Sequence, residues 1–440
     1  MFKKLALGLL GLLVLYLVVV ASDLLPRTTA EQQQALDLLQ QPPQRARGSN
    51  DAFPMLWSLR HDVPEAERAA LLAADQKRYA ELEASGRAID FQSGAKKYPE
   101  AWPDSASLCP RAQEADCLAH VRANLEPIRA AVTQHAGLLA RAAALRDTDH
   151  ARYGFKPSLA SPLPSMGIGP LQVTASALDF VEGRQNVALE NACRDFASWR
   201  RLRSHTDMLV LDMVGVAFAN EHMALLAGML AELPVDHPLP ESCTTALVAP
   251  DAGEFDQCDV WRGEFASITN TIVGHSSADI AMMEGRSPRF YDRLPSLVLN
   301  ERATVASFAP YYGHLCSQTP AVMPEQGWVS RTFNPMGRII LETALPNVSG
   351  YQQRVHDFAA IVQGLRTLVW LRGQPDAAAA FAQRPGDLKP ADRDITLDAS
   401  GHRLLVPLLQ PRDNTAKQWP LPLPASRLSP APVVAAAPVN

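Results

Sequence analysis

The chain has 440 residues, of which 47% are hydrophobic and 20% are charged, and its formal net charge is -5. This composition is typical of a globular protein, and the length allows one large domain or two to three smaller ones. Because 41 Lys and Arg stand against 46 Asp and Glu without a basic cluster, the chain offers no positive face to phosphates. Nucleic-acid binding is therefore excluded.

The N-terminus carries the pattern of an export signal. Lys3 and Lys4 precede an uninterrupted apolar run at residues 5–21. The run is longer than the apolar core of a cleaved signal peptide and just long enough for a transmembrane helix. Since flanking lysines stay on the cytoplasmic side, we predict a signal anchor at residues 1–27 that crosses the bacterial inner membrane once and leaves the rest in the periplasm. Cleavage after Ala21 stays open as the alternative.

An even number of cysteines in an exported chain predicts disulfides. The chain contains Cys109, Cys117, Cys193, Cys243, Cys258 and Cys316. The pairs Cys109–Cys117 and Cys243–Cys258 each bracket a short segment rich in turn-forming residues, and elimination then pairs Cys193 with Cys316. A zinc site is the alternative, but the chain lacks the closely spaced cysteine pair that such a site needs, so we predict no metal and no cofactor.

Apolar residues spaced by three and four predict a mostly helical domain at residues 28–410. The predicted elements in chain order are a short helix opened by a capping box at Thr28 to Glu31, a helix over 64–83, one long helix over 118–142, a helical hairpin over 189–202 and 209–230, and a last long helix over 351–371. Two alternating runs at 394–397 and 403–408 predict a β-hairpin. The Pro- and Ala-rich tail at 411–440 is predicted to be disordered.

Several titratable residues fall within the predicted helices. His135 lies on the apolar stripe of the long helix, where it is expected to be a core or rim histidine because no second titratable residue shares that stripe. Asp207, Asp212, Glu221 and His222 suggest a metal site of the helix-bundle type. However, the adjacent Glu221 and His222 diverge by about 100° on a helix, so a solvated face is the favoured interpretation.

One string resembles a catalytic motif. Gly274 to Ala278 reads Gly-His-Ser-Ser-Ala, and the β-branched run Ile268 to Val273 precedes it. A strand, a sharp turn and a helix around Ser276 would form a nucleophile elbow of the α/β-hydrolase type. The chain lacks the alternating strands and helices of that fold, so Ser276 or Ser277 is expected to cap a helix instead.

Three segments together carry a resemblance. They are Ser49-Asn50-Asp51-Ala52-Phe53, the turn Asn334-Pro335-Met336-Gly337-Arg338, and the helix from Tyr351 to Leu371 before the terminal hairpin. With the N-terminal signal and the cysteines, they resemble an uncharacterised family of exported, membrane-tethered helical proteins of Gram-negative bacteria. The resemblance implies the location and the helical fold, and it carries no activity or catalytic residue.

The sequence therefore predicts an all-α periplasmic domain with a C-terminal β-hairpin, held by an inner-membrane anchor at residues 5–21. We expect a binding or scaffold protein with a protein partner in the cell envelope, such as an envelope-complex subunit or an inhibitor or immunity partner. An envelope hydrolase that uses Ser276 is one alternative. A helical sensor that binds a small molecule or a lipid is the other, and an apolar pocket between helices would favour it.

Overall fold

The computed structural model describes residues 2–21, 27–103, 108–112, 114–274, 299–319, 327–345, 349–390, 392–412 and 416–424. Within these ranges the fold is mostly helical and ends in a small antiparallel sheet. The predicted helical class is confirmed, and the sheet has three strands where the sequence predicted two.

The elements follow the chain in this order. The α-helices are α1 Phe2–Ala21, α2 Ala30–Leu39, α3 Phe53–Ser58, α4 Glu65–Ala84, α5 Cys117–Ala123, α6 Leu125–Gln134, α7 Ala136–Ala143, α8 Gly169–Val181, α9 Gln185–Ser204, α10 Leu209–Glu232, α11 Glu241–Ala246, α12 Cys258–Gly274, α14 Glu301–Cys316, α15 Trp328–Phe333, α16 Pro335–Ala344, α17 Ser349–Arg372 and α18 Ala377–Ala382. Short 3₁₀ helices are η1 Ala88–Asp90, η2 Gly94–Lys97, η4 Ala144–Asp147, η5 Ala252–Phe255 and η8 Gly386–Leu388. The strands are β1 Thr396–Leu397, β2 Arg403–Arg412 and β3 Ala416–Pro422.

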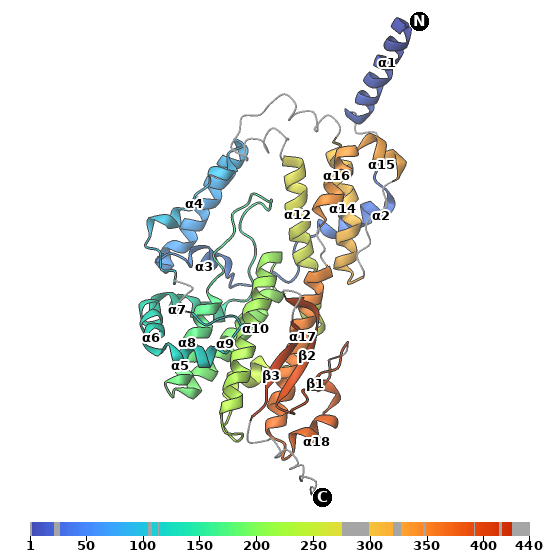
Figure 1. Cartoon of the computed structure of the whole chain (residues 1–440). Coiled ribbons are helices and arrows are strands. Elements are labelled where there is room, and N and C mark those ends of the chain that lie inside the picture. The colour runs from blue at the N-terminus through green and yellow to red at the C-terminus, as the bar shows by residue number, and fades with distance from the viewer. Residues whose placement is uncertain are drawn as a thin grey trace, which may run out of the picture.

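The helices fall into two groups with separate cores. Figure 1 shows α1 projecting from one end, with α12, α14, α15 and α16 nearest to it, while α5 to α10, α17 and the sheet form the far part. The smaller core lies in the near group and includes Trp261, Phe265, Tyr312 and Leu341. The larger core fills the far group, and α10 runs from one group toward the other.

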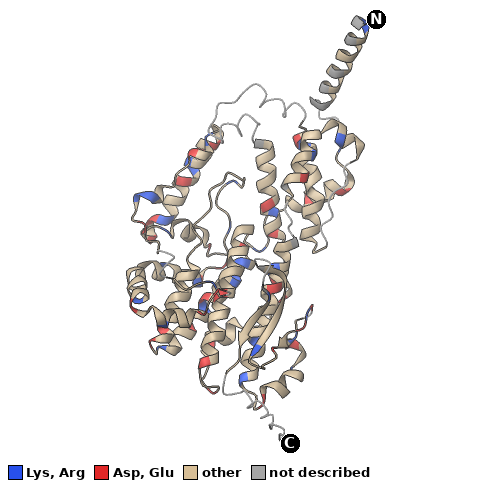
Figure 2. Cartoon of the chain, in the orientation of Figure 1, with Lys and Arg blue, Asp and Glu red and all other residues tan. Residues whose placement is uncertain are grey.

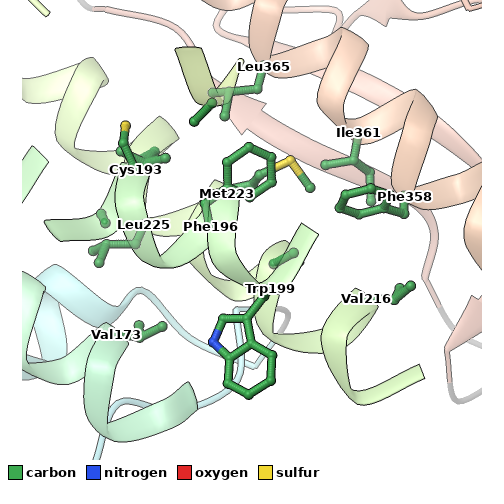
Figure 3. Close-up of a cluster of buried hydrophobic side chains, with 14 of the residues drawn as sticks. Val173, Cys193, Phe196, Trp199, Val216, Met223, Leu225, Phe358, Ile361 and Leu365 are labelled. Atoms are coloured by element: carbon green, nitrogen blue, oxygen red, sulfur yellow. The ribbon is translucent and has the colours of Figure 1, made fainter. Parts of the chain in front are cut away.

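The helical hairpin of α9 and α10 is the centre of the larger core, as the sequence predicted. Gly215 on α10 lets the two helices approach closely, because a β-carbon there would lie 2.6 Å from the Cβ of Arg203. Helix α17 packs on the hairpin, and Figure 3 shows Phe358 of α17 beside Met223 of α10 and Phe196 of α9. Full burial of such large side chains contributes roughly 1.5–3 kcal/mol each.

The sheet has the order β1-β2-β3, with both neighbouring pairs antiparallel. Strands β1 and β2 form the predicted hairpin, with Gly401 at a φ of +71° in its turn. Strand β3 lies inside the segment predicted to be disordered, so that prediction is wrong for residues 416–422. The reason is burial: Trp419 and Leu421 of β3 are packed into the larger core.

Two helix predictions need correction. The single helix expected over residues 118–142 is three helices, α5, α6 and α7, which break at Asn124 and His135. Pro127 accounts for the first break, because its ring would clash with the carbonyl of Ala123 in a continuous helix. The capping box of α2 lies one residue later than predicted and joins Thr29 to Gln32. The predicted helices over 64–83 and 351–371 are confirmed as α4 and α17.

All six cysteines form disulfides, but two of the three predicted pairs are wrong. Cys109 pairs with Cys117 as predicted. The other two bonds are Cys193–Cys243 and Cys258–Cys316, in place of Cys243–Cys258 and Cys193–Cys316. Cys193 on α9 meets Cys243 because α11 packs on α9. Cys258 begins α12 and Cys316 ends α14, so the third bond joins two helices that pack side by side in opposite directions.

The apolar N-terminal run is helical throughout α1, and its described leucines are exposed. Figure 2 shows positive charge at the N-terminal end of this helix. Within the described ranges, α10 is the helix whose length and apolarity would suffice to cross a membrane, and 56% of its apolar window is buried in the fold. Helix α10 is therefore a core helix.

Candidate functional site

A cavity of about 780 Å³ lies between the two groups of helices. Its wall comes from the end of α2 and the two prolines after it, the loop at residues 152–163, the start of α10, and the length of α12 from Arg262 to Val273. The mouth is open and apolar, since Leu159, Leu163 and Val273 line it and are 70%, 58% and 58% exposed. The volume is within the roughly 300–1,000 Å³ that is usual for small-molecule sites.

Helix α12 fixes the segment that follows α2. The carboxylate of Asp259 accepts hydrogen bonds from the backbone amides of Gln44, at 2.7 Å, and of Arg45 and Ala46. It also pairs with Arg262 at 2.9 Å. Arg262 in turn donates to the carbonyl of Leu38, at 3.2 Å. The buried ion pair of Asp259 and Arg262 thus binds both the end of α2 and the segment that follows it.

The loop at residues 152–163 is held to α12 by two bonds. The amide of Asn270 donates to the carbonyl of Pro157 at 2.8 Å, and the backbone amide of Leu159 donates to the hydroxyl of Thr271 at 2.9 Å. Within the loop, the hydroxyl of Tyr153 donates to the carbonyl of Pro162 at 2.8 Å. A loop with these bonds keeps its shape, so the cavity is a preformed site.

The segment that leads into α10, residues 207–210, lines the cavity and requires a glycine on α12. A β-carbon at Gly263 would lie 1.9 Å from the carbonyl oxygen of Asp207, so only glycine permits this approach. The Asp207 carboxylate accepts a bond from the backbone amide of Tyr153 at 2.8 Å. Asp207 therefore joins the loop to α10 at the point where α12 passes closest.

Two carboxyl groups line the cavity, and burial raises the pKa of both. Burial raises the pKa of Asp207 from 3.8 to about 6, although the bond from the Tyr153 amide opposes the shift. Burial also raises the pKa of Glu264 above its ordinary value. Each anion thus costs free energy in this site. A hydrogen-bond-donating or cationic group of a ligand beside them would offset that cost.

The shift at Asp207 gives a pH-dependent prediction for Asp207→Asn. The folded protein binds this proton more tightly than the unfolded chain, so stability falls as the pH rises from about 4 to about 6 and stays lowered above. Asparagine keeps the acceptor for Tyr153 and carries no charge. We expect the variant to be more stable than the wild type by about 2–3 kcal/mol at pH 8, with the gain vanishing near pH 4. Urea unfolding across that pH range measures it, and a variant that is equally destabilised at every pH would contradict it.

The titratable residues noted in the sequence do not come together as a metal site. Asp207 lines the cavity, whereas Asp212 and His222 are fully buried, so a solvated face is wrong for these two. Burial lowers the pKa of His222 to about 4. Glu221 accepts a bond from the backbone amide of Ala112 at 2.7 Å. No cluster of three or more His, Cys, Asp or Glu side chains suited to a metal ion occurs in the described ranges.

The residues before the hydrolase-like string do not fit the hydrolase alternative. Residues 268–273 belong to α12, so the strand required before a nucleophile elbow is a helix. Ser276 itself lies outside the described residues.

His135 is partly exposed where α6 ends and α7 begins, and thus is not on a continuous core stripe. The sequence did not reveal the cavity, although the polar residues at 262–270 within an apolar helix were a usable signal.

No family model matches the chain, and no curated protein or solved structure matches it either, so the candidate site is defined by the chain's own residues alone.

Proposed function

We propose that this protein is a membrane-tethered binding protein, and that its ligand is a small amphipathic molecule held in the cavity between α2, α12 and the loop at residues 152–163. The observation that carries the proposal is the cavity itself, because it combines an apolar mouth with two partly buried carboxyl groups. Among the functions compatible with the sequence, an apolar pocket between helices favours the ligand-binding sensor.

The lining indicates the chemistry of the ligand. Leu159, Leu163 and Val273 at the mouth suit a hydrocarbon body, while Asp207 and Glu264 accept hydrogen bonds from a head group. Since both carboxyl groups lose solvation, a cationic or donor-rich head is favoured over an anionic one. The preferred ligand class is therefore an amphipathic amine or a comparable molecule with a hydrogen-bond-donating head.

The tether places this site beside a membrane. Helix α1 in the bacterial inner membrane, with the remaining chain in the periplasm, would bring the cavity to the surface from which amphipathic molecules partition. Ligand occupancy would then be passed to a protein partner in the envelope. The short apolar run with two lysines before it and the exposed leucines of α1 support the span.

An alkylamine that carries a photoactivatable diazirine tests this function on the full-length chain in lipid nanodiscs. We expect cross-links on peptides that contain residues 152–163 and 262–273, and weaker labelling by a matched fatty acid probe. The variant Ala266→Leu fills the cavity wall and should lower labelling about tenfold, which corresponds to a loss of about 1.4 kcal/mol in binding.

Ala119→Leu is the matched control, because Ala119 is exposed on α5 and does not line the cavity. Its labelling should equal that of the wild type. Labelling spread over the surface, or labelling that Ala266→Leu does not change, would overturn the proposed function.

A further inference from the structure

Helix α15 contacts the N-terminal helix at a defined point. The hydroxyl of Tyr16 donates a hydrogen bond to the carbonyl of Thr332 at 2.8 Å. The ring of Tyr16 stacks on that of Phe333, with centroids 5.9 Å apart. Figure 1 shows α15 next to the end of α1 that leads into the rest of the chain.

The position of Tyr16 in α1 gives the depth of this contact. Tyr16 precedes the end of α1, Ala21, by five residues, which is about 7.5 Å along a helix. If α1 spans a membrane and ends at its outer surface, Tyr16 lies below that surface by this distance. Helices that lie in a membrane interface are buried to about 5–10 Å, which is the depth at which α15 would then sit.

Two large apolar side chains are exposed on α15 and α16, and polar side chains such as Glu342 and Thr343 lie beside them. Trp328 at the start of α15 is 73% exposed, and Ile339 on α16 is 53% exposed. Leu341 of α16 is fully buried in the smaller core. Residues two positions apart on a helix are rotated by about 200° around its axis. Ile339 therefore lies on the opposite side of α16 from Leu341 and the core.

We propose that α15 and the outer side of α16 dock on the outer leaflet of the membrane that α1 crosses, with Trp328 and Ile339 inserted at the level of the lipid headgroups. Tryptophan favours this region because its ring is amphipathic. The exposed Arg331 lies on the same short helix, where it can meet headgroup phosphates. The inference rests on the proposed span by α1, and it adds a second contact that sets the orientation of the domain against the membrane.

Quenching by brominated lipid tests the docking on the full-length chain in nanodiscs that hold one copy. The emission of Trp328 is obtained as the difference between the wild type and Trp328→Phe. Phosphatidylcholine brominated near the headgroup end of its acyl chains should reduce this emission at least about twofold, because the ring lies at headgroup depth. The matched control is Trp419→Phe: Trp419 is buried in β3, far from α1 in Figure 1, and its difference emission should not change.

A second variant checks the same surface. Ile339→Ser should weaken the quenching of Trp328, whereas Val248→Ser, at an exposed apolar residue outside α15 and α16, should leave it unchanged. Flotation of the chain with lipid vesicles reports on the span separately. A chain that floats while Trp328 is not quenched overturns the docking and leaves the tether standing, and a chain that does not float overturns both. Emission that changes only with two copies per nanodisc would assign the surface to a second copy and also overturn the docking.

Discussion

Asp212→Ala is expected to lower the free energy of unfolding by about 3–5 kcal/mol, because it leaves a guanidinium buried without its counter-ion. Arg203 and Asp212 pair at 2.9 Å, with side chains that are 1% and 0% exposed. The second oxygen of Asp212 accepts a bond from Gln257 at 2.5 Å. The pair links α9 to α10 at the centre of the larger core, so its loss should weaken the whole fold. Urea unfolding of the full-length chain at pH 7 measures the change.

An exposed ion pair provides the control for this prediction. Arg87 and Asp90 pair at 2.7 Å, but their side chains are 66% and 49% exposed. Asp90→Ala should therefore cost less than about 1 kcal/mol. The double replacement of Arg203→Met with Asp212→Leu should recover most of the stability, since an apolar pair leaves no buried charge. Equal costs for Asp212→Ala and Asp90→Ala would contradict the account of the core.

Removal of the Cys258–Cys316 disulfide is the other large effect. The bond closes a loop of 58 residues. For a loop of this length, the chain-entropy relation gives a stabilisation of about 4 kcal/mol. It also fastens the start of α12, the helix that lines one side of the cavity. We expect the double replacement of Cys258→Ser and Cys316→Ser to lower the free energy of unfolding by about that amount and to weaken labelling of the cavity by the alkylamine probe.

The shorter Cys109–Cys117 disulfide is the matched control. It closes only 8 residues, for which the same relation gives about 2–3 kcal/mol, and neither half contributes to the cavity wall. Its removal by two serines should leave the labelling unchanged. If removal of the shorter bond cost more stability or abolished labelling, the assigned role of Cys258–Cys316 in the cavity would be wrong.

The sequence predicted those elements whose local pattern agrees with their packing. The hairpin of α9 and α10 and the long helix α17 have regular apolar spacing because each packs on the core along its whole length. The β-branched run at residues 268–273 would be a strand only under the hydrolase alternative, and it is helical because packing of α12 in the smaller core outweighs the strand propensity of isoleucine and valine. Strand β3 was missed because its prolines made the segment look disordered. Two of its residues, Trp419 and Leu421, are buried in the larger core.

The site could not be predicted because it depends on distant segments. Asp207 was noticed, but its role follows from Tyr153 and Gly263, which approach it only after α10, α12 and the loop at residues 152–163 have packed together. The disulfide pairs failed for the same reason. Proximity in sequence favoured Cys243 with Cys258, whereas helix packing brings each of them to a partner 50 or 58 residues away.

Native mass spectrometry of the full-length chain, released directly from its own membrane, tests the central claim that the cavity holds an amphipathic ligand. The account predicts a non-covalent adduct of defined mass on the wild type and on Ala119→Leu, and its loss from Ala266→Leu, because leucine at that position occupies the cavity wall. A bare chain in all three proteins, or the same adduct on Ala266→Leu as on the wild type, would contradict it.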